Sequence, residues 1–258
     1  MADMLELFTA GPVSPVPDAA APAVRLEGIA RRFGQRWILR GIDLTVEPGQ
    51  VLALTGRNGS GKTTLLRIIG TLLRPSRGTA AVFGHDTVRS PEPIREWIGL
   101  LGHNNALYDD LTSYENLVFS LRMAGLPVDR SVVDAALEQV GLVQVRSERV
   151  RGFSAGMRRR LGLARLLLRP PRVLLLDEPY ASFDQDGIDL VNEFAAHTAR
   201  NGGVVLLTTH DMARAVEVMS RRIHIADGRL TEVHEGGAQV STRNEHVAAW
   251  VAVKGGTL

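Results

Sequence analysis

The 258-residue sequence contains no cysteine, only two lysines and no long apolar run. Without cysteine the chain has no disulfide framework and no thiolate metal site, which fits a reducing compartment. No stretch approaches the 18 or more apolar residues that a membrane-spanning helix needs. Acidic Asp3 and Glu6 lie where a secretory signal peptide would carry basic residues. We therefore expect the chain to stay in the cytoplasm.

Arginine supplies almost all of the positive charge. Of the 30 basic residues, 2 are lysine and 28 are arginine, and with 28 acidic residues the formal net charge is +2. We attribute the excess of arginine to genome composition rather than to a surface for nucleic acid or anionic lipid. No nucleic-acid partner is expected. The rarity of lysine makes the position of Lys62 informative.

Composition changes twice along the chain. Residues 1–23 hold four prolines and little that can pack, which predicts a disordered leader, and residues 234–258 are expected to form a C-terminal tail. Between them, short apolar strand patterns alternate with helical patterns, as in α/β proteins. The block from about 91 to 170 shows a strand pattern only at 98–101, so it predicts a helical insertion.

Two strand patterns are clear enough to interpret. Residues 42–46 and 51–55 flank a Pro-Gly turn, which predicts a hairpin whose second strand is buried. The fully apolar run at 173–176 predicts a strand in a parallel sheet that is covered on both faces.

Helix starts are marked by capping residues. Thr112 and Glu115 form a capping box that predicts a helix extending to about Met123. Ser131 is expected to repeat that device for the next helix, and Ser154 is expected to begin a helix that ends before Pro-Pro at 170–171.

The strongest motif lies at residues 56–63, Gly-Arg-Asn-Gly-Ser-Gly-Lys-Thr, between a strand and a helix. Backbone N–H groups and the helix N-terminus form an anion site there, and glycine is needed because a Cβ would block close approach. Lys62 is predicted to bind the β- and γ-phosphates, and the Thr63 hydroxyl to bind Mg²⁺. The nucleotide-binding residues expected from this segment are Gly56, Asn58, Gly59, Ser60, Gly61, Lys62, Thr63 and Thr64.

Two carboxylates end a buried strand at residues 174–178, Leu-Leu-Leu-Asp-Glu. Asp177 suits a Mg²⁺ ligand acting through water, since Mg²⁺ keeps much of its hydration. Glu178 is placed to polarise an attacking water as general base. Together with the loop at 56–63, the pair is a strong signal for a site that binds a nucleotide phosphate with Mg²⁺ and activates water.

Over about residues 24–233 these motifs make the chain resemble the ATP-binding cassette (ABC) ATPase family. The resemblance implies an α/β P-loop NTPase fold with a mainly parallel sheet core, an antiparallel β subdomain and a helical insertion. It implies ATP and Mg²⁺ as cofactors and a second ATPase subunit, in a head-to-tail homodimer, as partner. It also implies integral membrane permease subunits on other chains, which would hold the ATPase peripherally at the cytoplasmic face of a bacterial membrane.

The resemblance assigns roles to three further residues, Ser154, Asp184 and His210. The family signature segment reads Phe-Ser-Ala-Gly-Met at 153–157 and retains Ser154 and Gly156 of the commoner Leu-Ser-Gly-Gly-Gln. By resemblance, Ser154 contacts the γ-phosphate bound by the other subunit. Asp184 ends the D-loop, which crosses the dimer interface. His210 matches the switch histidine that reaches the γ-phosphate.

Two positions leave alternatives open. Phe33 lies where the family stacks an aromatic ring on adenine, with Trp37 as the second candidate. The family's glutamine loop is replaced here by Gly-His-Asn-Asn at 102–105. Either His103 or Asn104 takes the place of the glutamine and contacts the metal-bound water; we name His103 as the catalytic and metal-site candidate.

Segments 176–187 and 202–210, with Gly102 and His103, resemble the ATPases that serve haem export in cytochrome c maturation. The alternatives are the ATPase of another exporter, for drugs or polysaccharides, and a soluble iron–sulfur assembly ATPase. Relatives that act in DNA repair carry an inserted coiled coil, and relatives that act in translation carry two cassettes in one chain. This sequence shows neither feature, so both classes are disfavoured. A P-loop kinase or GTPase would lack the signature segment found here at 153–157 and the switch histidine found here at His210.

The helix at about 111–126 is expected to dock the cytoplasmic helix of a permease. It carries more apolar residues than one buried helix face needs. They are Leu117, Val118, Phe119, Leu121 and Met123.

Overall fold

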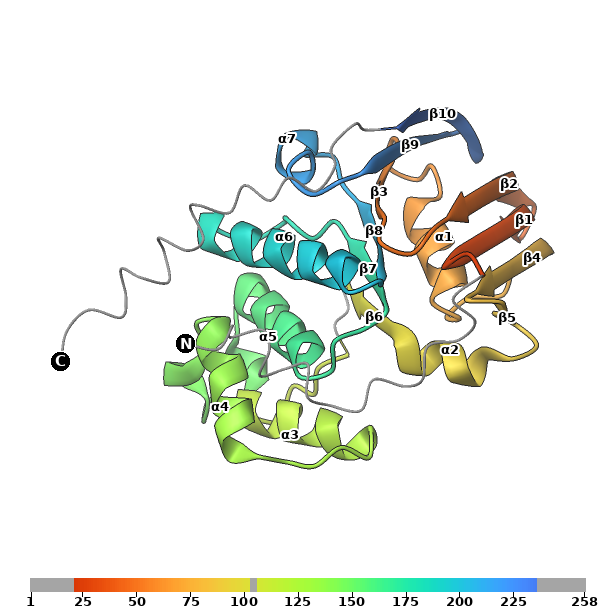
Figure 1. The fold of residues 1–258 in the computed structure, drawn as a ribbon. Coiled ribbons are helices and arrows are strands. Elements are labelled where there is room, and N and C mark those ends of the chain that lie inside the picture. The colour runs from red at the N-terminus through yellow and green to blue at the C-terminus, as the bar shows by residue number, and fades with distance from the viewer. Residues whose placement is uncertain (1–20, 103–105, 236–258) are drawn as a thin grey trace.

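The computed structural model describes residues 21–102 and 106–235 (Figure 1). None of the helices in these two ranges is long and apolar enough to cross a membrane. The elements in chain order are β1 (Val24–Phe33), β2 (Arg36–Val46), β3 (Val51–Thr55), α1 (Lys62–Ile69), β4 (Arg77–Val82), β5 (His85–Asp86), α2 (Pro91–Trp97), β6 (Ile98–Leu101), α3 (Ser113–Met123), α4 (Arg130–Gln139), α5 (Ala155–Leu167), β7 (Val173–Asp177), α6 (Gln185–Arg200), β8 (Val204–Thr208), α7 (Met212–Ala215), β9 (Arg221–Ala226) and β10 (Arg229–Glu235).

The strands form two sheets. A six-stranded sheet has the order β10-β9-β3-β8-β7-β6, and a four-stranded sheet has the order β2-β1-β4-β5. In the larger sheet every pairing from β9 to β6 is parallel and only the β9–β10 hairpin is antiparallel. The smaller sheet is antiparallel throughout. The expected fold, a mainly parallel core with an antiparallel β subdomain and a helical insertion, is confirmed.

Both faces of the larger sheet are covered, which explains its apolar strands. Along β7, Leu174 and Leu176 pack in one core cluster with residues of α5 and α6. Val173 and Leu175 point the other way, into a cluster with α1 and the antiparallel sheet. Figure 1 shows these helices on opposite sides of the sheet.

The prediction that residues 42–46 and 51–55 form a hairpin is wrong. β2 pairs with β1 in the antiparallel sheet, whereas β3 lies between β8 and β9 in the parallel sheet. Both edges of β3 are therefore occupied, and the Pro-Gly turn carries the chain from one sheet to the other. Gly49 has φ of 81°, and its N–H donates to the carbonyl of Gly203 at 2.7 Å.

Two of the three predicted helix caps are found as expected. Thr112 caps α3 in a complete capping box with Glu115, and the Ser154 hydroxyl accepts from the N–H of Met157 at the start of α5. The third prediction is wrong by two residues, because Asp129, rather than Ser131, caps α4. Asp and Asn cap the start of a helix as well as Ser does, so the position of the cap depends on where the chain turns into the helix.

The helical insertion is narrower than the block at 91–170. α3, α4 and α5 share one core cluster. α2 instead packs under the antiparallel sheet through Ile94 and Trp97. Of the expected leader and tail, residues 1–20 and 236–258 lie outside the described residues. Ala23, placed in the leader, is fully buried, and its carbonyl accepts from the N–H of Phe83.

Candidate active site

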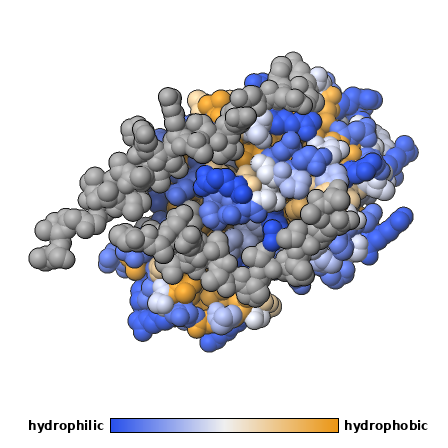
Figure 2. Space-filling model, viewed as in Figure 1, coloured by the Kyte–Doolittle hydropathy of each residue, from blue (hydrophilic) through white to orange (hydrophobic). Residues whose placement is uncertain are grey.

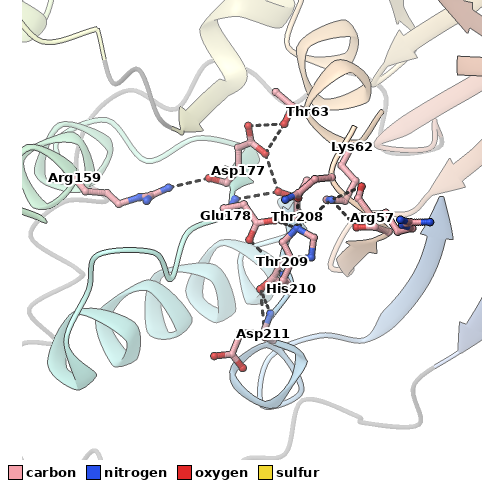
Figure 3. A network of polar contacts seen from close by, with 12 residues as sticks. Arg57, Lys62, Thr63, Arg159, Asp177, Glu178, Thr208, Thr209, His210 and Asp211 are labelled. Carbon is pink, nitrogen blue, oxygen red and sulfur yellow. Dashed lines mark hydrogen bonds and ion pairs between the residues drawn. The ribbon is translucent and has the colours of Figure 1, made fainter. Parts of the chain in front are cut away.

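Three neighbouring parallel strands bring the chemical groups together. β3, β8 and β7 lie side by side, so their carboxyl ends share one edge of the sheet, the usual ligand-binding edge of α/β folds. The loop at 56–63 follows β3, Asp177 ends β7 with Glu178 directly after it, and His210 follows β8. Figure 3 shows these side chains converging on one space.

The loop at 56–63 requires glycine at two positions. Gly56 has φ of 144°, and a Cβ there would lie 2.4 Å from the carbonyl oxygen of Ile225. Gly61 has φ of 110°, and a Cβ would lie 2.5 Å from a methyl group of Leu39. Gly61 also precedes α1 without a side-chain cap, so the first N–H groups of the helix face the loop. This geometry can bind an anion.

Lys62 is buried within that loop. Its ammonium donates to the carbonyls of Gly56 at 2.7 Å and Arg57 at 3.3 Å. Burial lowers the pKa of Lys62, and the nearby charges of Glu178 and Asp177 oppose that effect. A desolvated cation held by neutral carbonyls gains strongly from an anionic ligand.

Thr63 and Asp177 form an all-oxygen donor set. The Thr63 hydroxyl lies 3.0 and 2.9 Å from the two carboxylate oxygens of Asp177. Thr208 donates its hydroxyl to Oδ1 of the same carboxylate at 2.8 Å. Mg²⁺ prefers one or two protein oxygens together with water and phosphate, so Thr63 and Asp177 fit this ion.

Glu178 and His210 face each other across the same space. Glu178 has φ of 50°, a left-handed conformation that costs on the order of 1 kcal/mol in a non-glycine residue. Its Oε2 accepts from the N–H of His210 at 3.3 Å, and its Oε1 lies 3.2 Å from His210 Nε2. The Asn58 amide oxygen lies 2.8 Å from the same nitrogen. The Lys62 ammonium lies 3.5 Å from the same nitrogen, so Nε2 faces two oxygen atoms and one cation.

The signature segment packs against the D-loop. Ser154 is exposed at the start of α5, and a Cβ on Gly156 would lie 2.8 Å from the carbonyl oxygen of Ser182. Asp184 caps α6 by accepting from the N–H of Gly187, and its carboxylate also pairs with Arg160 of α5. Asp184 is thus tied to the signature helix of its own chain.

The remaining predicted residues that the structure describes lie outside the network of polar contacts formed by Lys62, Asp177, Glu178 and His210. Phe33 ends β1 with 49% of its surface exposed, and the Arg31 guanidinium lies 4.7 Å from its ring. Trp37, the second candidate, is half-buried beside Arg77. Thr64 is half-buried on α1. His103 and Asn104 lie outside the described residues, so the glutamine-loop alternatives stay open.

Two buried polar residues of the site were missed. Thr208 contacts both Asp177 and Glu178. Its signal was available, because a polar residue at the end of a fully apolar strand marks the functional edge of the sheet. Arg159 donates to the carbonyls of Asp177 at 2.9 Å and Ala181 at 2.8 Å. Nothing in a run of three arginines tells which one is buried, so no sequence signal identified it.

The fold and the site define a P-loop nucleoside triphosphatase. The ABC transporter family model matches residues 39–181. The daunorubicin resistance ATP-binding protein DrrA3 of Streptomyces coeruleorubidus is 39% identical over 221 residues, 85% of this chain and 69% of the relative. The cytochrome c biogenesis ATP-binding export protein CcmA of Nitrosococcus oceani is 36% identical over 216 residues, 84% of this chain and 94% of the relative.

Solved structures agree on the fold. A dimeric ATP-binding cassette in a post-hydrolysis state, bound to ADP and Pi, superposes with a TM-score of 0.71 at 24% identity, covering 83% of this chain and 99% of that one. The chain belongs to the ABC transporter ATP-binding family. It is an ATP-binding, ATP-hydrolysing subunit of an ABC transporter.

Proposed function

We propose that this chain is the ATPase subunit of a haem exporter of the cytochrome c maturation type. It acts as a homodimer at the cytoplasmic face of a bacterial membrane, bound to a permease on other chains. The observation that carries the proposal is the near-complete coverage of CcmA, 94% of its length. DrrA3 is slightly more similar but extends further, with 69% covered. Drug export is therefore the second candidate. The catalytic unit spans about residues 23–235, because Ala23 is buried in the fold and β10 extends to Glu235.

Each residue of the site has a defined task in this proposal. The amides of the loop at 56–63 and the Lys62 ammonium bind the phosphates, and Phe33 stacks on adenine. Thr63 and Asp177 would hold Mg²⁺, which would offset the negative charge of the phosphates. Glu178 accepts a proton from the attacking water, and His210 forms a hydrogen bond to the γ-phosphate.

The second subunit completes each site. Ser154 is exposed at the N-terminus of α5, on a different segment from the phosphate-binding loop. Its hydroxyl and the backbone amides of the first helical turn are placed to bind an anion. In a head-to-tail pair it contacts the ATP held by Lys62 and Glu178 of the partner. The similarity in fold to a dimeric cassette supports this arrangement.

Mixing two inactive variants should restore one site. In a heterodimer of Lys62→Ala with Ser154→Arg, one site carries both lesions and the other carries neither. Random mixing at equal amounts makes about half of the dimers heterodimers, so roughly a quarter of the sites are intact. We expect the mixture to retain labelled ATP after desalting at about that level. Retention that stays at the background of each variant alone, at every mixing ratio, would show that the site is built within one chain.

The permease docks beside α3. A groove of about 330 Å³ lies there, and Tyr108, Phe119 and Met123 line it. Met123 is 72% exposed and Tyr108 is 52% exposed, and the Tyr108 and Phe119 rings meet edge to face at 4.7 Å. Figure 2 shows apolar colour on the lower part of the visible face, where Figure 1 places α3 and α4.

Only part of the apolar set expected on this helix is available for docking. Leu117 and Leu121 are buried in the core, and Val118 packs against it. Arg165 and Arg169 also line the groove. Their positive charge favours an amphipathic partner helix that carries an acidic residue.

Deleting the gene in its native bacterium should abolish covalent haem staining of c-type cytochromes, and the wild-type gene should restore it. Met123→Glu should fail to restore staining, because a charge in the groove prevents docking, while ATP hydrolysis by the purified variant is unchanged. Leu72→Glu, which alters a residue that is 64% exposed and does not line the groove, should restore staining.

The outcomes separate the two parts of the proposal. Normal cytochromes in the deletion strain would exclude haem export, and a new sensitivity to anthracycline drugs would favour the second candidate. Full restoration by Met123→Glu would place the docking surface elsewhere.

A further inference from the structure

Thr208 is the last residue of β8 and is completely buried. Its neighbour in the sheet is Asp177, which ends β7 and pairs with it in register. Thr208 therefore lies beside Asp177 at the point where both strands end, next to the segments that carry Glu178 and His210. Figure 3 shows it at the centre of the polar network.

One hydroxyl makes two hydrogen bonds of opposite sense. Thr208 Oγ1 donates to Asp177 Oδ1 at 2.8 Å. The same oxygen accepts from the backbone N–H of Glu178 at 2.9 Å. A hydroxyl has one proton and two lone pairs, so it can satisfy both contacts at once. Because the Thr208 side chain is fully buried, its hydroxyl is shielded from bulk water.

The second bond bears on a strained residue. Glu178 has φ of 50°, and the Thr208 carbonyl also accepts from its N–H at 3.1 Å. Two acceptors on one N–H hold the backbone in the left-handed conformation that directs the carboxylate toward His210. The first bond fixes the Asp177 carboxylate, which Thr63 contacts from the other side.

We propose that Thr208 is a positioning residue that sets the metal-ligating carboxylate of Asp177 and the catalytic carboxylate of Glu178 relative to each other. This inference rests on the proposed roles of those two residues. The side chain of Thr208 is itself fully buried. It acts by keeping the two groups in one geometry, through a hydroxyl that valine cannot replace.

Two substitutions separate the hydroxyl from the packing. Thr208→Val keeps the shape and removes both hydrogen bonds, and we expect the maximal ATPase rate to fall by at least about tenfold, the effect of losing a buried, charge-assisted hydrogen bond. The Mg²⁺ concentration that half-saturates nucleotide binding should rise several-fold. Binding of a fluorescent ATP analogue in EDTA should be unchanged. Thr208→Ser keeps the hydroxyl and should remain within about threefold of wild type.

Thr198→Val is the matched control. Thr198 is a buried threonine in α6 whose hydroxyl donates to the Phe194 carbonyl, away from the site. It should lower the melting temperature about as much as Thr208→Val does and leave the Mg²⁺ requirement unchanged. The inference is overturned if Thr208→Val keeps wild-type kinetics and Mg²⁺ requirement, or if Thr208→Ser is as impaired as Thr208→Val. Glu178→Gln in the same assay tests the proposed function separately, since activity in that variant would remove the catalytic role of Glu178 whatever Thr208 does.

Discussion

Glu178→Gln should bind ATP normally and hydrolyse it about 10²–10⁴ times more slowly than the wild type, the usual effect of removing a general base. Glutamine keeps the shape of the side chain and an oxygen that accepts from the N–H of His210, so the geometry of the loop is preserved. It cannot accept a proton from water. Because turnover is blocked after binding, the dimer should accumulate with ATP trapped in it, and size-exclusion chromatography with bound-nucleotide analysis measures this.

The matched control for this variant is Glu92→Gln. Glu92 is an exposed residue in the first turn of α2, outside the site, so the same chemical change there should leave hydrolysis and the oligomeric state unaffected. Near-normal steady-state hydrolysis by Glu178→Gln would refute the assignment of the base. Loss of ATP binding in this variant would instead indicate that Glu178 has a structural role.

The motifs predicted the core of the site because they encode local backbone geometry. A strand, a glycine-rich turn and a helix must follow one another for the loop at 56–63 to bind phosphate, and the sequence shows all three in order. The approach of Asp177 to Thr63 was also expected, since Asp177 ends β7, Thr63 lies in the first turn of the helix after β3, and parallel strands end at one edge of the sheet.

Contacts between distant segments could not be predicted in this way. Residues 42–46 and 51–55 fit a hairpin locally, yet β3 lies between β8 and β9, which come far later in the chain. The burial of Arg159 likewise depends on where the D-loop packs on α5. Such tertiary arrangements override a local pattern, so they became visible only in the fold.

Helix caps could be predicted only where the local sequence offered a single choice. Asp129 and Ser131 both suit the start of α4, and the backbone direction before the helix selects Asp129. In α3 the capping box has two reciprocal bonds, between Thr112 and Glu115, and this pairing left no alternative.

Lys62→Ala should abolish most of the stabilisation that ATP gives to the folded chain. A ligand present at about 100 times its dissociation constant stabilises a protein by roughly 2.7 kcal/mol. For a chain of this size that corresponds to a rise in melting temperature of about 5–10 °C. Lys62 supplies the buried cation of the phosphate-binding loop, and alanine leaves the phosphates without it. We therefore expect an ATP-induced shift below about 1 °C for the variant, measured by differential scanning fluorimetry.

Arg57→Ala is the control, because it removes an exposed positive charge from the same loop. Figure 3 shows the Arg57 side chain directed away from the space between Lys62 and Glu178. If the net charge of the loop were what binds ATP, both variants would lose the thermal shift equally. If the buried ammonium binds the phosphates, Arg57→Ala keeps the wild-type shift and only Lys62→Ala loses it. An unchanged shift in Lys62→Ala would contradict the phosphate-binding role of the loop.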